Sequence, residues 1–277
     1  MTNTTDPAGR LVFGDDGSAG AERAWQWLTA QQWPTWQIDV LTVTPVEPSL
    51  ADVFAYQPLR EYRPERPRTA PRTMSFGSIR HLTTAFEPRV VLGEIQDADL
   101  VVVGARGDGV LKELRLGSAA DWLIRRSRTP VVVAIAARPV REVLLCVDEQ
   151  GRAGSAAEVL SQMPWVTRAA VTILAVCPEY GTELPAAEQA ASVLKAAGAG
   201  VQIMRVIPDP QAIAASPKFK IFEFIDKRDP DLVVVGTRGL SGVARLVAGS
   251  TAGAIAGYVS TAVMVVRDQA GATGAAA

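Results

Sequence analysis

The chain has 277 residues, of which 48% are hydrophobic and 21% are charged, and its formal net charge at pH 7 is -1. This composition is typical of a globular protein, and the near-zero net charge excludes a global attraction to nucleic acid or to an anionic membrane. The length is sufficient for two domains of ordinary size, each with a core of its own.

Residues 1–9 are polar and lack the basic start and apolar core of a signal peptide, and no apolar run reaches the length of a membrane span. We therefore expect a disordered N-terminus and a cytoplasmic protein without nucleic-acid or membrane partners. The two cysteines, Cys146 and Cys177, lie in apolar runs and form no Cys-x-x-Cys pair. Buried free thiols are favoured over a redox or disulfide role.

The first half of the chain, residues 10–137, predicts a doubly wound α/β domain, because apolar runs alternate with helical patterns. After the opening strand, the Gly-Asp-Asp-Gly-Ser turn at 14–18 leads into a helix with Trp25 and Leu28 on its apolar face. All strands are expected to be parallel. The strands are expected at 11–13, 38–43, 79–86, 100–103 and 130–133, and the later helices at 89–96 and from Gly117-Ser118 to about 126.

Residues 46–78 interrupt this pattern with interleaved prolines and arginines, among them Pro64, Pro67, Arg66 and Arg68. Such a segment cannot hold a long helix and lacks apolar anchors, so it predicts an irregular or extended insertion. A solvated loop is the simpler interpretation. A basic lid over a bound nucleotide, or a docking arm, is the functional alternative.

The second half, residues 140–268, repeats the α/β pattern without this insertion, after a linker at 136–141. The tail at 269–277 consists largely of Gly, Ala and Thr and is expected to be disordered. The strands are expected at 143–147, 170–176, 201–206, 232–235 and 262–266, and the helices at 154–163, 185–197, 219–227 and 250–258.

A glycine motif occurs once in each half, 132 positions apart. Leu100–Val103 is followed by Gly-Ala-Arg-Gly, nine residues and Gly-Ser, and Leu232–Val235 is followed by Gly-Thr-Arg-Gly, nine residues and Gly-Ser. The matched spacing indicates a duplicated domain. Each motif joins a strand to a helix, where unpaired N–H groups and glycines favour a close phosphate.

This motif, placed after an apolar strand and about 90 residues beyond a strand that ends in Asp, resembles the nucleotide-binding signature of the universal stress protein family. The resemblance covers residues 10–136 and 140–267. It implies two tandem open parallel five-stranded sheets flanked by helices, which is a Rossmann-like arrangement of the adenine nucleotide alpha-hydrolase type.

The resemblance also implies roles for single residues. Asp16 and Asp148 would contact the ribose or the metal-nucleotide region, and the backbone at Val43 and Val176 would face the adenine. The ribose and phosphates would be held at the two motifs, by Gly104, Gly107, Gly117, Ser118, Gly236, Arg238, Gly239, Gly249, Ser250 and Thr251.

Structural interpretations remain open for two of these residues. Asp16 precedes Gly-Ser and a helix, so it is also a suitable turn or capping residue. Ser118, with Asp121 three positions later, also fits a capping box. The second motif has no acidic residue in the first turn of its helix, but its half begins with Asp148-Glu-Gln in place of Asp-Gly-Ser.

We therefore expect a cytosolic stress-response protein that binds ATP, with Mg²⁺ on the phosphates, and that is not an enzyme. The single histidine, His81, is expected in or beside a strand, and the Walker lysine is missing, which argues against efficient hydrolysis but leaves slow ATP hydrolysis open. The alternative is a scaffold without nucleotide. Its apolar edges at 131–134 and 263–266 would pair the two halves as an intrachain pseudo-dimer or form a homodimer.

Overall fold

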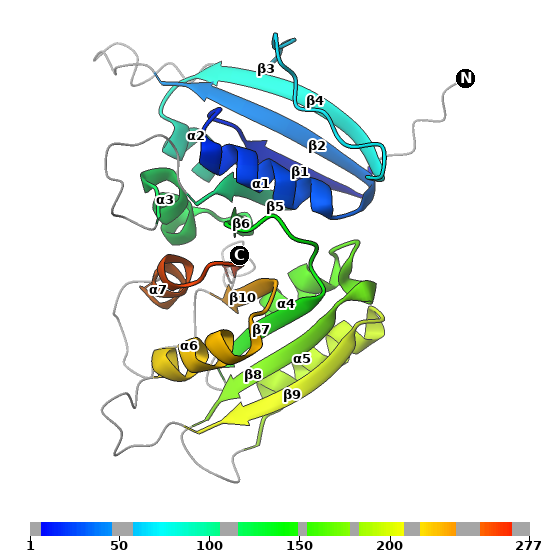
Figure 1. The fold of residues 1–277 in the computed structure, drawn as a ribbon, viewed down its shortest axis with the longest axis vertical. Helices are drawn as coiled ribbons and strands as arrows, with labels where there is room; N and C mark the ends of the chain where they lie inside the picture. Colours follow the sequence, from blue (N-terminus) through cyan, green and yellow to red (C-terminus); the bar gives the residue numbers. More distant parts are fainter. Residues whose placement is uncertain are drawn as a thin grey trace, which may run out of the picture. The chain divides into compact units, whose positions relative to one another are not determined.

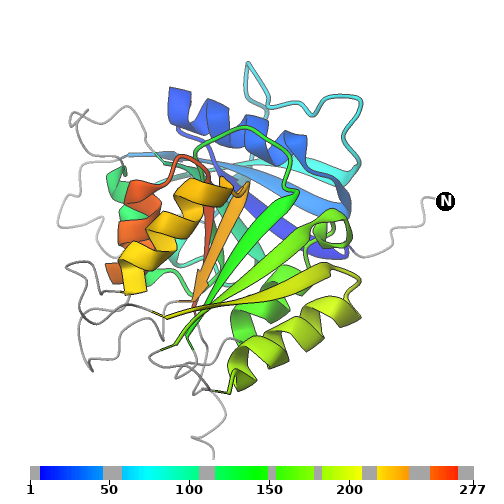
Figure 2. The ribbon, with the colours of Figure 1, turned by 60° about the horizontal axis from the view of Figure 1, so that its bottom comes forward.

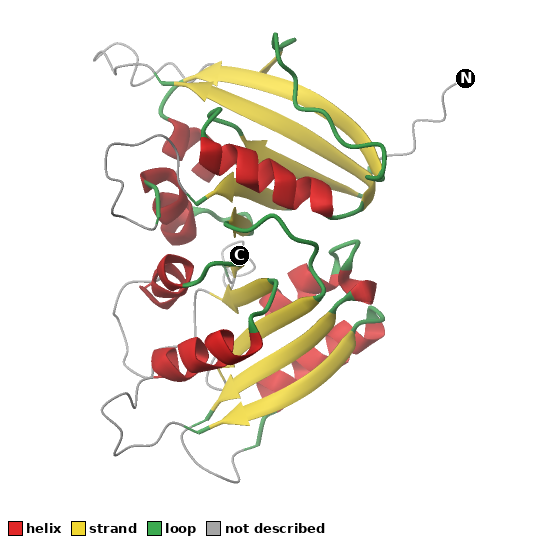
Figure 3. Cartoon of the chain, in the orientation of Figure 1, coloured by secondary structure: helices red, strands yellow, loops and turns green. Residues whose placement is uncertain are grey.

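The computed structural model describes residues 7–45, 58–105, 116–148, 154–177, 183–207, 217–236 and 250–267. The chain divides into two compact units, Met1–Pro139 and Val140–Ala277. Each unit is a twisted sheet with helices on both faces (Figures 1 and 3). In the described part of the chain, no helix combines the length and the apolar character that crossing a bilayer requires.

The sheet of the first unit has the strand order β3-β4-β2-β1-β5-β6. Its described strands are β1 (Gly9–Gly14), β2 (Trp33–Thr44), β3 (Arg60–Glu61), β4 (Phe76–Ala85), β5 (Leu100–Gly104) and β6 (Val131–Ala134). The five expected strands are present and parallel, but β3 pairs with β4 in the antiparallel sense. The expectation of only parallel strands is therefore wrong at this edge, because β3 belongs to the Pro/Arg-rich segment.

Helices α1 (Ala19–Ala30), α2 (Pro88–Gly93) and α3 (Ser118–Arg126) accompany this sheet. Ser18 caps α1, because its Oγ accepts the N–H of Ala21 at 3.1 Å. The helix buries Trp25, whose ring lies 5.2 Å from that of Phe13 on β1. The apolar spacing in the sequence thus places α1 against one face of the sheet.

The second unit has the strand order β11-β10-β7-β8-β9, with every pair parallel. Helices α5 and α6 lie on opposite faces of this sheet (Figure 2). Its elements are β7 (Glu142–Asp148), α4 (Gly154–Ser161), a 3-10 turn (Val166–Arg168), β8 (Ala170–Val176), α5 (Pro185–Ala196), β9 (Gly200–Val206), α6 (Pro217–Arg228), β10 (Leu232–Gly236), α7 (Ser250–Tyr258) and β11 (Ala262–Val266).

The strand that precedes the glycine motif is buried in each unit. The four apolar residues of β5 and of β10 are buried, as is typical of parallel strands covered on both faces. Cys146 and Cys177 are buried free thiols, which confirms the expectation. Burial raises the pKa of the Cys146 thiol to about 12.

The two units differ most in the connection from their second strand to the next parallel strand. In the second unit this crossover contains α5, whereas the described part of the first-unit crossover, residues 58–75, contains β3 and no helix. We call residues 58–75 the strap. Residues 76–78, expected in the loop, belong to β4. The strap adds β3 to the edge of the sheet and is therefore more than an added surface loop.

Candidate functional site

In both units the strand order reverses at the first strand. β1 pairs with β2 on one side and with β5 on the other, and β7 pairs with β8 and β10. Crossovers therefore leave the first strand in opposite directions, which opens a crevice at the carboxyl ends of the strands. The two glycine motifs begin at this edge, since β5 ends at Gly104 and β10 ends at Gly236.

Gly104, the first glycine of its motif, lies directly against the start of α1. A Cβ at this position would stand 2.5 Å from the backbone carbon and oxygen of Gly20 and 2.9 Å from the amide nitrogen of Ala21. These contacts are with backbone, which cannot move aside without shifting the helix. Gly104 therefore allows β5 and α1 to pack closely, whether or not it also contacts a ligand.

Gly117, the third glycine, closes the first motif. Its N–H donates to the carbonyl oxygen of Ala105 at 2.6 Å, and its carbonyl accepts the N–H of Asp121 at 3.0 Å. The end of β5 and the start of α3 are therefore adjacent, as phosphate binding at the motif would require.

The capping-box interpretation of Ser118 is wrong, because Gly117 is the N-cap of α3 and Ser118 is the first helical residue. Asp121 is engaged instead with Arg125, whose Nε donates to the two carboxylate oxygens at 2.9 and 3.1 Å. This pair is largely exposed, so it contributes little stability, but it partly neutralises the carboxylate in the first turn.

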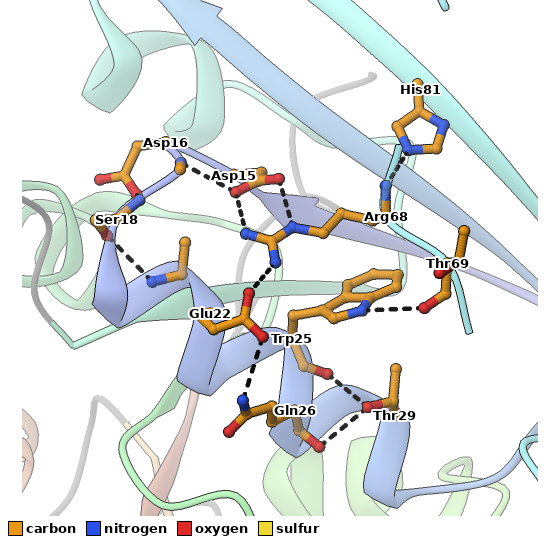
Figure 4. Close-up of polar contacts among 12 residues, drawn as sticks. Asp15, Asp16, Ser18, Glu22, Trp25, Gln26, Thr29, Arg68, Thr69 and His81 are labelled. Carbon is orange, nitrogen blue, oxygen red and sulfur yellow. Dashed lines mark hydrogen bonds and ion pairs between the residues drawn. The ribbon is translucent and has the colours of Figure 1, made fainter. Parts of the chain in front are cut away.

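The turn after β1 is held by its own carboxylates (Figure 4). Asp16 is exposed, and its Oδ1 accepts the N–H of Ser18 at 3.0 Å. Asp15 accepts the N–H of Gly17 at 3.1 Å, and Gly17 has φ +74°, which favours glycine. Asp16 thus makes the local turn contact, and its contact with a ribose stays a prediction.

Arg68 of the strap is a residue of this region that the sequence did not single out. Its Nε and one terminal nitrogen donate to the two oxygens of Asp15 at 2.8 and 2.9 Å, and its other terminal nitrogen pairs with Glu22 (Figure 4). Burial acts to raise the pKa of Asp15, but the hydrogen bonds from Arg68 and Gly17 have the larger opposite effect. The pKa of Asp15 therefore lies below its ordinary value.

His81 connects the strap to the sheet. It lies in β4, which confirms the expected strand position. Its Nε2 accepts the backbone N–H of Arg68 at 3.0 Å, and its carbonyl accepts the N–H of Tyr62 at 3.1 Å. The hydroxyl of Tyr62 is 2.9 Å from the Oγ1 of Thr42 on β2.

The remaining predicted site residues are placed only in part. Val43 lies near the end of β2, where it is paired with Thr84 of β4. The backbones of Asp148 and Val176 end β7 and β8, and those of Ser250 and Thr251 begin α7, but the side chains of these four lie outside the described residues. Gly107, Arg238, Gly239 and Gly249 lie wholly outside the described residues.

The described residues contain no group of three or more His, Cys, Asp or Glu side chains that could hold a metal ion.

Comparison with known proteins places this geometry in a family. The sequence profile described as the universal stress protein family matches residues 84–134 and 139–267, more than half of the chain. A universal stress protein of Mycolicibacterium smegmatis is 29% identical over 201 residues, which cover 65% of this chain and 65% of that protein.

Two solved structures share the fold. A universal stress protein from Archaeoglobus fulgidus superposes with a TM-score of 0.60 at 16% identity, over 93% of this chain and 98% of that one. A functionally unknown protein from Pseudomonas aeruginosa superposes with a TM-score of 0.56 at 16% identity, over 93% and 92% of the two chains. The duplicated motif, the strand order and the two profile matches agree, and the chain belongs to the universal stress protein family.

Proposed function

We propose that the chain binds ATP, with Mg²⁺ on the phosphates, at the carboxyl ends of its strands, and that the occupied or empty state serves as a stress signal. The observation that carries this proposal is the position of the two motifs. Each begins on a strand that neighbours the point of reversed strand order, where open α/β sheets bind ligands.

The residues of the first motif fit a phosphate. The N-cap of α3 is a glycine, which brings no side chain, and no side-chain capping bond is made there. The first-turn N–H groups and the positive end of the helix dipole would stabilise an anion at this place. A bound nucleotide would add the negative charge that this end of the helix favours.

The second unit offers the electrostatically better site. The first turn of α7 contains no acidic residue, whereas that of α3 contains Asp121. A carboxylate in the first turn competes with a phosphate for the same N–H groups and the same dipole. We infer that the second unit binds ATP more tightly than the first.

Isothermal titration of ATP into the untagged chain tests the proposal. Gly117→Val and Gly249→Val each place a branched side chain at one motif, and each is expected to remove one of two binding events. Gly200→Val is the matched control, because a Cβ there meets only the carbonyl of Ala169, at 3.9 Å. Unchanged ATP affinity in both motif variants would show that the motifs are not the site.

A scaffold role without nucleotide is the second candidate, and a specific observation favours it in the first unit. Gly104 packs against α1, and the N–H of Gly117 is already bonded to Ala105. Gly104 would thus be needed for the fold alone, and the Gly117 N–H is already engaged within the chain. Native mass spectrometry of gently purified protein separates the two functions, because co-purified ATP or AMP supports binding and its absence after ATP addition supports the scaffold.

A further inference from the structure

The strap is fixed to the first unit by polar contacts from several elements (Figure 4). The guanidinium of Arg68 binds Asp15, which follows β1, and Glu22 of α1. The indole N–H of Trp25 on α1 donates to the carbonyl of Thr69 at 3.4 Å. The strap therefore joins the turn after β1 to α1 and the sheet.

His81 holds the strap through two hydrogen bonds of different kinds. Its backbone carbonyl accepts the N–H of Tyr62, and this bond does not depend on pH. Its Nε2 accepts the N–H of Arg68, which requires a neutral imidazole with its proton on Nδ1. Protonation converts Nε2 from an acceptor into a donor, so the bond to Arg68 cannot survive it.

We propose that His81 and Arg68 form a pH-sensitive latch, which strengthens docking of the strap while the imidazole is neutral and weakens it on acidification. The surroundings of His81 act on the charge of its imidazole in opposite directions. Burial opposes a positive charge on the imidazole, whereas the Asp15 carboxylate favours one, although Arg68 already binds that carboxylate in two hydrogen bonds. The ring of Tyr62 stands edge-on to the imidazole at 6.4 Å.

The sign of the pH effect follows from burial. Burial lowers the pKa of His81, and the opposing influence of Asp15 is smaller. The docked state therefore binds fewer protons than the released state. The latch is at full strength above the ordinary histidine pKa of about 6.5, and it weakens as the pH falls below that value.

Release of the latch would also free the turn that contains Asp15 and Asp16. Asp15 holds the N–H of Gly17 with the same carboxylate that binds Arg68. Loss of the strap removes the guanidinium that fixes this carboxylate, so the order of the turn depends on the strap. None of these contacts of the strap requires a bound nucleotide.

His81 is the only histidine, so its imidazole can be observed directly in the untagged chain. Nitrogen NMR is expected to show an unprotonated Nε2 and a protonated Nδ1 at pH 7.5. Two variants isolate the bond. His81→Gln offers a side-chain oxygen as acceptor and does not titrate, whereas His81→Phe keeps a ring and offers no acceptor.

Amide hydrogen exchange of Arg68, corrected for the intrinsic exchange rate at each pH, reports docking. Protection in the wild type is expected to fall roughly fivefold between pH 7.5 and 5.5, the change expected for loss of one neutral hydrogen bond. His81→Gln is expected to show no such fall, and His81→Phe to be unprotected already at pH 7.5.

The amides of α5 are the internal control and are expected to stay protected at both pH values. A proton on Nε2 at pH 7.5, or the same pH dependence in the wild type and in His81→Gln, would overturn the latch. The NMR result and the His81→Gln comparison decide the question even if His81→Phe fails to fold.

Discussion

The strap and α5 make the same connection in their two units but are held by different forces. α5 begins at Pro185 and buries a stripe of small residues and Leu194 against its sheet. The strap buries Met74 but is fixed mainly by ion pairs and hydrogen bonds. The stabilisation from burying apolar surface is largely independent of pH and salt. The stabilisation from ion pairs and from a hydrogen bond to a histidine nitrogen depends on both. One crossover is thus constitutive and the other is conditional.

The family comparison agrees with this difference. The profile matches nearly all of the second unit but begins at residue 84 in the first. It therefore omits α1, β2 and the strap, and it enters the first unit only near the end of β4. The strap and most of its contacts thus lie outside the two matched segments.

The largest expected effect comes from the apolar crossover. Leu194→Ala removes a fully buried side chain and leaves a cavity, which is expected to destabilise the second unit by about 2–5 kcal/mol. Amide hydrogen exchange in urea, followed separately for peptides of each unit, measures this loss of stability. The control is Ser192→Ala at an exposed position of the same helix, whose free energy of unfolding is expected to stay within about 0.5 kcal/mol of the wild-type value. An equal loss of stability in both units would show that their cores are not independent.

Arg68→Ala tests the polar crossover. It leaves the half-buried Asp15 without its bidentate partner and is expected to weaken strap docking by about 1.5–3 kcal/mol, because hydrogen bonds to charged groups are the strong ones. Trypsin should then cut the strap after Arg60 and Arg72 at least roughly tenfold faster, whereas Arg63 and Arg66 are each followed by proline and are not cut. The control Arg66→Ala removes an exposed arginine of the strap. Trypsin should cleave this variant after Arg60 and Arg72 at the same rate as the wild type. Equal cleavage of the two variants would exclude a role for Arg68 in docking.

Gly104→Ala separates packing from binding in the first motif. The added Cβ would press on the backbone of Gly20, so the first unit is expected to lose about 1–3 kcal/mol of stability. Thermal unfolding without nucleotide measures this loss, and Gly200→Ala, where the Cβ has room, is the control. A stable Gly104→Ala protein that lacks ATP affinity would instead assign this glycine to the ligand.

The sequence predicted the duplicated fold because strands such as β5 and β10 are continuous apolar runs that end in a repeated motif. It also placed Asp16 in a turn and the cysteines in the core. It did not predict that Arg68, among several arginines, would reach Asp15. That pair lies 53 positions apart, and its formation depends on the crossover that brings the strap over β1. The capping-box alternative for Ser118 is wrong by one position, because glycine is also an acceptable N-cap and Gly117 takes that place.

The smallest effect concerns a second acid step in the strap. The pKa of Asp15 is lower in the folded protein than in the unfolded chain. The ionised carboxylate therefore stabilises the docked strap fully above the unfolded-state pKa of about 3.9, and this stabilisation is lost as the pH falls through the lower folded-state pKa. Arg68 amide protection in the His81→Gln background, which removes the histidine step, is expected to fall by a further few-fold below about pH 4.

Asp15→Asn in that background is expected to abolish this fall, because the amide does not titrate, and to begin from weaker protection at neutral pH. Asp16→Asn is the matched control one position away and is expected to keep the fall, since the Asp16 carboxylate binds the N–H of Ser18 in the turn rather than Arg68 of the strap. Amides of α5 should keep their protection over the same range, since the helix is held by apolar burial. A parallel loss in α5 would mean that acid acts on the whole chain, and the distinction between a conditional and a constitutive crossover would fail.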